Sequence, residues 1–172
     1  MTTKIECRSY MTVKLVDSMG TDLDICRNAW VSTKGERAEE EQDAARVKGL
    51  INYLVREKHG SPFESVAFKF LITAPLFVWR EFHRHRIGFS YNEESGRYTQ
   101  LKPVFYFLDS TRPLVQIGKT GHYEYVSGSH EQFVLTNQAI IENSKDSYER
   151  YEQMLEAGVA KEVARMVLPV NI

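Results

Sequence analysis

Residues 80–98 read Arg80-Glu81-Phe82-His83-Arg84-His85-Arg86-Ile87-Gly88-Phe89-Ser90-Tyr91-Asn92-Glu93-Glu94-Ser95-Gly96-Arg97-Tyr98. The stretch holds four arginines, two histidines and three glutamates, and it follows an apolar segment. Guanidinium groups present planar forks of hydrogen-bond donors that match phosphate and carboxylate oxygens. Carboxylates beside them accept hydrogen bonds from the polar edge of a ring. The pattern therefore indicates a site for a ligand with both an anion and polar ring edges, such as a nucleotide.

Three other interpretations of this stretch stay open. The first is a solvated helix face, because arginines four residues apart form ion pairs with neighbouring glutamates. The second is a metal site in which His83 and His85 are ligands and Glu81 or Glu93 is the third, although adjacent arginines repel a cation. The third is a nucleic-acid patch, which normally belongs to a basic domain, whereas this chain has a formal net charge of −1.

The stretch resembles the signature of the flavin-dependent thymidylate synthases, which is Arg-His-Arg, seven further residues and a serine. Here Arg84-His85-Arg86 precedes Ser90-x-Asn92-Glu93-x-Ser95-x-Arg97-Tyr98. Eight residues, not seven, separate Arg86 from Ser95. We place the extra residue within Ile87-Gly88-Phe89, because the spacing from Ser90 onward is that of the family. Gly88 would absorb it in a turn.

Three other parts of the chain resemble the same family, in the family's order. His59-x-Ser61-Pro62-Phe63-Glu64 is similar to a block that contributes to the flavin site, although Ser65 stands where the family usually has a histidine. Ala164-Arg165-x-Val167-Leu168-Pro169 is similar to a block whose arginine contacts the nucleotide. The segment Val13-Lys14-Leu15-Val16-Asp17-x-Met19-Gly20 resembles the family's start.

The resemblance implies roles for individual residues. It implies that FAD is contacted by His59, Ser61, Arg84, His85, Arg86 and Glu93. It implies that dUMP is contacted by Glu81, Arg84, Glu93, Glu94, Ser95, Gly96, Arg97 and Arg165. No metal ligand is implied. No catalytic side chain is implied within the chain either, since the family's further arginine is expected beyond Ile172.

The activity that the resemblance implies is the reductive methylation of dUMP to dTMP. Methylenetetrahydrofolate supplies the carbon, and NADPH supplies the hydride through FAD. The family is a homotetramer with its sites between subunits. Only two cysteines, Cys7 and Cys26, and no long apolar run occur, so we expect a cytoplasmic protein without a nucleic-acid or membrane partner. Family members continue well past Ile172, so we expect the chain to be a single domain, residues 1–172, without the family's C-terminal segment. The alternatives are a catalytically weak nucleotide- and flavin-binding protein of the same fold and a regulatory nucleotide-binding module.

Composition and periodicity predict an α+β fold, with a small mixed or antiparallel sheet and long helices packed on it. A chain of 172 residues with 42% hydrophobic and 26% charged residues fits one globular domain. Alternating apolar residues predict strands over 5–16, 65–74 (with one well-buried face) and 104–108, and a turn over 17–20. Helices are predicted after an N-cap at Asp22 through Ala29, from Ala38 to His59, after an N-cap at Ser61, from Pro75 towards Arg84, over 129–157 and over 161–169. Loops are predicted over 31–37 and 109–128.

Overall fold

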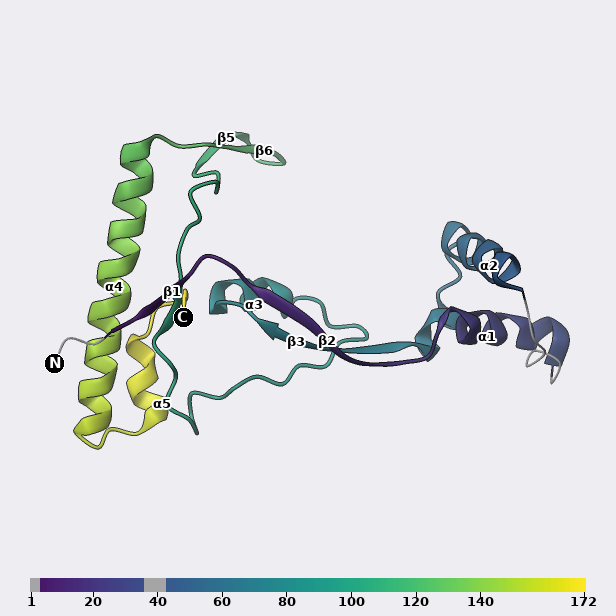
Figure 1. Ribbon diagram of the computed structural model, residues 1–172, viewed down its shortest axis with the longest axis horizontal. Coiled ribbons are helices and arrows are strands. Elements are labelled where there is room, and N and C mark those ends of the chain that lie inside the picture. The colour runs from purple at the N-terminus through teal and green to yellow at the C-terminus, as the bar shows by residue number, and fades with distance from the viewer. Residues whose placement is uncertain (1–3, 36–42) are drawn as a thin grey trace. The chain divides into compact units, whose positions relative to one another are not determined.

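The computed structural model describes residues 4–35 and 43–172. The chain forms two compact units (Figure 1). Unit 1 comprises residues 1–12 and 73–172, and unit 2 comprises Val13–Ile72. Helices and small sheets occur together, which confirms the predicted α+β class. Among the described residues the strands pair in three two-stranded sheets, β1 with β4, β2 with β3, and β5 with β6. No described helix is both long and apolar enough to cross a membrane.

Unit 2 is built around two helices, α1 (Asp22–Lys34) and α2 (Ala44–Arg56), beside the strands β2 (Thr12–Met19) and β3 (Ala67–Thr73). Its small core is formed where the apolar stripe of α2 meets α1. Cys26 and Trp30 of α1 are buried there, at 0% and 8% exposure. Leu23, Val47, Leu50 and Ile51 pack against them. Val47, Leu50 and Ile51 belong to the apolar stripe that helix periodicity predicts on α2, whereas Val55 of the same stripe is 62% exposed.

The start of α1 differs from the prediction. A capping box closes the helix at Thr21, whose hydroxyl accepts from the Asp24 N–H (3.4 Å) while the Asp24 carboxylate accepts from the Thr21 N–H (2.8 Å). The N-cap is therefore Thr21 and not Asp22, and the helix continues past Ala29 through residues that were predicted as loop. Strand β2 likewise runs on to Met19, so the predicted turn over 17–20 is wrong except at Gly20.

The second helix and the block after it also need correction. Helix α2 ends at Arg56, not His59, and its predicted start at Ala38 lies outside the described residues. Ser61–Ser65 is a short 3₁₀ helix whose N-cap is Gly60, so the predicted cap at Ser61 is wrong. Proline at the second position of that helix fixes the backbone, and no side chain is needed to cap it.

The predicted strand over 65–74 is present as β3, but its well-buried face is not. The side chains of Phe68 and Phe70 are 61% and 51% exposed, and those of Val13 and Leu15 on β2 are 68% and 52% exposed. The alternation that predicts a buried face is real. A sheet of only two strands in the described chain leaves these apolar side chains at its surface.

Unit 1 contains a parallel pair, β1 (Glu6–Arg8) with β4 (Val104–Tyr106), in which Cys7 lies opposite Phe105. The predicted strand over 5–16 is therefore two strands, β1 and the first part of β2. Helix α3 (Leu76–Phe82) follows Pro75 as predicted. The long helix α4 (His130–Glu156) confirms the prediction over 129–157, with a capping box at Ser129. The predicted helix over 161–169 is shorter, α5 (Lys161–Ala164) followed by a 3₁₀ turn, Arg165–Val167.

The segment predicted as a loop over 109–128 contains a hairpin instead. Strands β5 (Val115–Lys119) and β6 (His122–Val126) pair antiparallel, and the chain then leads into α4 (Figure 1). Gly118 and Gly121 adopt φ values of 92° and 84°, which only glycine adopts readily. Glycines at these positions are typical of turns and loops, so the sequence predicts a loop here. The alternating runs on either side are too short to predict strands by themselves.

The core of unit 1 lies where α4 and α5 meet β4, and Figure 1 shows α4 beside α5. The residues buried there are Phe105, Phe107, Tyr148, Tyr151 and Ala164. Two of them also fix a backbone segment. The Tyr148 hydroxyl donates to the Leu101 carbonyl (2.8 Å), and the Tyr151 hydroxyl accepts from the Leu101 N–H (3.1 Å).

Candidate functional site

The segment Arg84-His85-Arg86 leaves the end of α3 as a turn. The His83 N–H donates to the Trp79 carbonyl (2.9 Å), and the His85 N–H donates to the Phe82 carbonyl (3.0 Å). The side chains of Arg84, His85 and Arg86 are all exposed. The helix end therefore directs two guanidinium groups and one imidazole to the surface.

Six rings surround this turn and form what we call the aromatic cluster. Its members are Trp79, Phe82, His83, His85, Phe89 and Tyr91. Tyr91 stacks on Phe89 with an interplanar angle of 9° and meets His83 edge-on at 4.9 Å. Aromatic pairs of this kind contribute about 0.5–1.5 kcal/mol beyond area burial.

The turn after Arg86 contains the segment where we place the extra residue. Gly88 has a φ of 74°, and the Phe89 N–H donates to the Arg86 carbonyl (3.4 Å) across a turn whose tip, Ile87, is 97% exposed. This conformation would accommodate an additional residue before Ser90, and the position of that residue stays a prediction.

A second turn holds Ser95, Gly96 and Arg97. The Tyr98 N–H donates to the Ser95 carbonyl (3.0 Å), and the Arg97 N–H donates to the Ser95 hydroxyl (3.3 Å). Gly96 is buried, and a Cβ there would lie 2.9 Å from Leu101 Cδ1. The absence of a side chain at Gly96 is thus a packing requirement.

This second turn contacts the start of α5 and Arg165, the residue that follows α5. Arg97 forms an ion pair with Glu162 (3.3 Å), and Lys161 Nζ donates to the Tyr98 carbonyl (2.9 Å). A Cβ on Gly96 would lie 3.3 Å from Arg165 Cδ, so the Arg165 side chain runs past the turn. Two parts of the sequence more than sixty residues apart are brought together in this way.

Lys161 and Glu162 were missed as neighbours of the site. Both directly precede the block Ala164–Pro169, and a charged pair next to a motif block is the signal that was available. Whether such a pair reaches a distant turn depends on tertiary packing, which the sequence pattern does not contain.

The predicted site residues divide between the two units. His59 and Ser61 belong to unit 2, where the His59 ring meets Tyr53 edge-on at 6.0 Å. The predicted residues in unit 1 are Glu81, Arg84, His85, Arg86, Glu93, Glu94, Ser95, Gly96, Arg97 and Arg165. Of these, Glu81, Glu93 and Glu94 are exposed carboxylates on the same stretch as the arginines.

The described part of the structure does not support the interpretation of His83 and His85 as metal ligands. Within residues 4–35 and 43–172, no group of three or more histidine, cysteine, aspartate or glutamate side chains is arranged to hold a metal ion. The rings of His83 and His85 pack instead against Trp79 and Phe82, at 5.6 and 5.8 Å between centroids.

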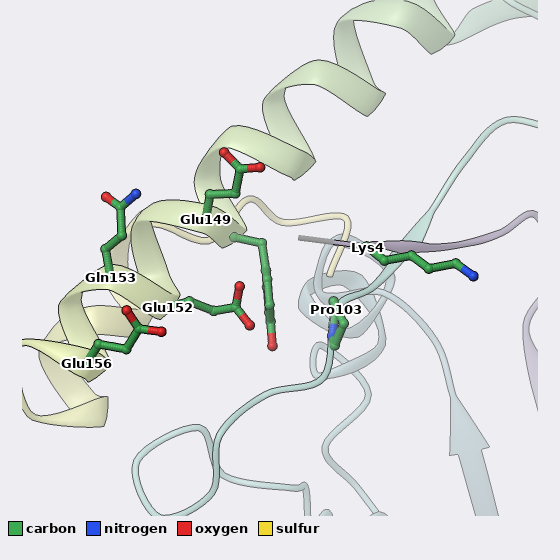
Figure 2. Close-up of a pocket in the computed structure, with 7 residues that line it drawn as sticks. Lys4, Pro103, Glu149, Glu152, Gln153 and Glu156 are labelled. Atoms are coloured by element: carbon green, nitrogen blue, oxygen red, sulfur yellow. The ribbon is translucent and has the colours of Figure 1, made fainter. Parts of the chain in front are cut away.

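A pocket of about 580 Å³ elsewhere in unit 1 has the wrong charge for an anion. Figure 2 shows Glu152 of α4 extending towards Pro103, with Glu149, Gln153 and Glu156 on the same helix, and Lys4 also lines the pocket. The glutamates are Glu149, Glu152 and Glu156. Like charges repel, so we do not assign this pocket to a phosphate-bearing ligand.

Known proteins resemble this chain over nearly its whole length. The model of the family described as thymidylate synthase complementing protein matches residues 14–172. A flavin-dependent thymidylate synthase of Streptomyces coelicolor is 54% identical over 171 residues, which are 98% of this chain and 70% of that protein. One of Thermotoga neapolitana is 42% identical over 164 residues, which are 93% and 66%.

A solved structure agrees with these sequence matches. The UMP/dUMP methylase PolB of Streptomyces cacaoi, bound with 5-Br dUMP, superposes with a TM-score of 0.89 at 45% identity, over 97% of this chain and 71% of that chain. The same residues that carry the signature form the two turns of unit 1. The chain belongs to the flavin-dependent thymidylate synthase family.

Proposed function

We propose that this chain methylates dUMP to dTMP, with methylenetetrahydrofolate as carbon donor and NADPH as reductant through FAD. The observation that carries the proposal is the contact of the Ser95–Tyr98 turn with Arg165 and Glu162. A ligand phosphate needs two or more donors that converge, and the Arg165 side chain passes the turn that carries Arg97.

The dUMP phosphate would bind at this turn. Arg97 is half-exposed and already held by Glu162 at 3.3 Å, so its guanidinium is oriented before a ligand arrives. Because that ion pair is exposed, it contributes little by itself and an incoming phosphate can replace it. Arg165, whose side chain runs past Gly96 in this turn, would add a second guanidinium. Glu81, Glu93 and Glu94 are the candidates to accept from the single N–H of the uracil ring.

The groups on the first turn fit FAD. Its pyrophosphate needs cationic donors, and Arg84 and Arg86 are exposed beside the rings of the aromatic cluster. His85 and Glu93 would contact the flavin, with His59 and Ser61 supplied by another subunit. When bound, FAD supplies the hydride that reduces the transferred carbon. The chain's own arginines would orient the two ligands and stabilise the negative charge that develops on the uracil.

We also propose a cytoplasmic homotetramer with sites between subunits. The exposed apolar side chains of β2 and β3 support self-association, because four of them, Val13, Leu15, Phe68 and Phe70, are each more than half exposed. Patches of this kind commonly mark protein–protein contacts. Analytical ultracentrifugation should give four times the mass of 19.9 kDa. A monomer at micromolar concentration would contradict the proposal.

The test of the proposed function is turnover. The chain, supplied with FAD, dUMP, methylenetetrahydrofolate and NADPH, should form dTMP. Arg86→Ala should give colourless protein that still folds, whereas Arg112→Ala, an exposed arginine elsewhere in unit 1, should stay yellow. If dUMP and FAD bind but no dTMP forms, the chain is a nucleotide- and flavin-binding protein and the proposed reaction is wrong.

A further inference from the structure

We propose that Tyr91 is a positioning residue for Arg84-His85-Arg86, through a hydroxyl that fixes the backbone of this turn. The proposal rests on the proposed function, because it takes these three residues to hold FAD. No role follows for Tyr91 from the family signature, in which its position is unspecified. The inference comes from the contacts of its hydroxyl and of its ring.

The hydroxyl of Tyr91 spans the turn. It lies 2.6 Å from the His85 carbonyl oxygen and 3.1 Å from the Phe82 carbonyl oxygen. A phenol has one proton, so the donated bond is shared between the two acceptors and is strongest to His85. The Phe82 carbonyl, at the end of α3, already accepts from the His85 N–H (3.0 Å), so the Tyr91 hydroxyl adds a second donor there. Through these contacts Tyr91 connects the end of α3 to His85, the residue between Arg84 and Arg86.

The ring of Tyr91 is also fixed, by packing against neighbouring rings. It stacks on Phe89 and meets Phe82 at 5.8 Å and Trp79 at 6.3 Å, both nearly at right angles. Tyr91 is half-buried in consequence. A donor whose ring is fixed by neighbours loses little further entropy when it makes a hydrogen bond.

The extra residue lengthens the loop after this turn, so the backbone of the turn needs a stabilising contact. The chain has eight residues between Arg86 and Ser95. Added length and a glycine increase the number of conformations open to a loop. The exposed tip at Ile87 and Gly88 lies between the arginines and Tyr91, so Tyr91 closes the loop from its far side. Long arginine side chains hold a ligand in place only if their backbone is fixed.

The experiment compares Tyr91→Phe, which keeps the ring and removes the hydroxyl, with Tyr123→Phe. Tyr123 is matched because its hydroxyl also makes one side-chain hydrogen bond in unit 1, to Thr120 at 3.2 Å. We expect Tyr91→Phe to raise the FAD dissociation constant about three- to tenfold, the range for one hydrogen bond. The dUMP dissociation constant and the midpoint of thermal unfolding should change little. Amide exchange of residues 84–88 should accelerate, and Tyr123→Phe should leave all four measurements unchanged.

A second variant, Phe89→Leu, keeps the hydroxyl and removes the stacked ring, and it should give a smaller loss of FAD affinity than Tyr91→Phe. The proposal is overturned if residues 84–88 exchange no faster in Tyr91→Phe, or if Arg86→Ala loses FAD affinity while Tyr91→Phe binds FAD as tightly as the unchanged chain. It is also overturned if FAD and dUMP affinities fall equally, because that indicates general loosening. Arg86→Ala separates the two proposals. If that variant keeps normal FAD affinity, the assignment of the turn to FAD is wrong, while accelerated exchange in Tyr91→Phe would still establish the stabilising contact.

Discussion

The two turns that carry the family signature are held in different ways. The Ser95–Tyr98 turn is anchored to the buried core, since Leu101 packs against Gly96 and its backbone is bonded to Tyr148 and Tyr151. The Arg84–Arg86 turn is anchored to the aromatic cluster, whose members are half-buried or exposed. Local stability follows buried contacts. The Ser95–Tyr98 turn should therefore be rigid before ligand binds, and the Arg84–Arg86 turn should depend on a few surface contacts.

Removing the buried anchor should have the largest effect. Tyr151 is 0% exposed, so Tyr151→Ala should lower the free energy of unfolding by about 3–5 kcal/mol, as truncation of a buried aromatic usually does. Urea denaturation measures the change. The matched control is Tyr125→Ala, where the ring is 63% exposed and the change should stay within about 0.5 kcal/mol. Similar losses in both variants would show that α4 does not anchor the turn.

Replacing Gly96 with alanine should affect only the Ser95–Tyr98 turn. In Gly96→Ala the new methyl group meets Leu101 Cδ1 at 2.9 Å and Arg165 Cδ at 3.3 Å, and overpacking typically costs about 1–3 kcal/mol. We expect weaker dUMP binding with FAD affinity preserved, measured by calorimetry. Gly49→Ala is the control, because nothing lies within 4 Å of its added Cβ and α2 should gain slightly in stability. Unchanged dUMP affinity in Gly96→Ala would separate this turn from the nucleotide site.

The smallest predicted effect concerns alkaline pH. Burial raises the pKa of the Tyr148 phenol above its ordinary value of 10.0, with a further contribution from the charge of Glu152. A raised pKa in the folded state means that this stability is complete below pH 10 and is lost as pH rises through the folded pKa. The free energy of unfolding should therefore fall above pH 10 more steeply in the unchanged chain than in Tyr148→Phe. Identical slopes would contradict a buried, donating phenol.

The sequence predicts individual helices and turns of this molecule better than it predicts which other elements pack on them. The helices α2 and α4 were predicted from their apolar stripes, and the turn at Gly88 was predicted from the glycine. The hairpin β5–β6 was missed because its strands are short and its glycines resemble those of a loop. The buried face of β3 was wrong because alternation indicates which side chains share a face and not whether another layer lies on it.

The site shows the same division between local and tertiary information. The arginines were identified from their order along the chain, since the guanidinium chemistry is a property of the residues themselves. The contact of Arg97 with Glu162 was not predicted, because it joins segments whose meeting depends on how α5 packs on α4. The hydroxyl of Tyr91 was missed for a similar reason, since its acceptors are backbone carbonyls that exist only once α3 has ended.

The central claim is that the Ser95–Tyr98 turn binds the dUMP phosphate, and calorimetry on Arg97→Ala tests it most directly. Charged hydrogen bonds contribute about 1.5–3 kcal/mol each, so the dUMP dissociation constant should rise about ten- to a hundredfold, while FAD affinity changes much less. Arg150→Ala is the control, because it breaks an exposed ion pair of the same kind, with Asp146 at 2.9 Å. If Arg97→Ala binds dUMP as tightly as Arg150→Ala does, the turn is not the phosphate site.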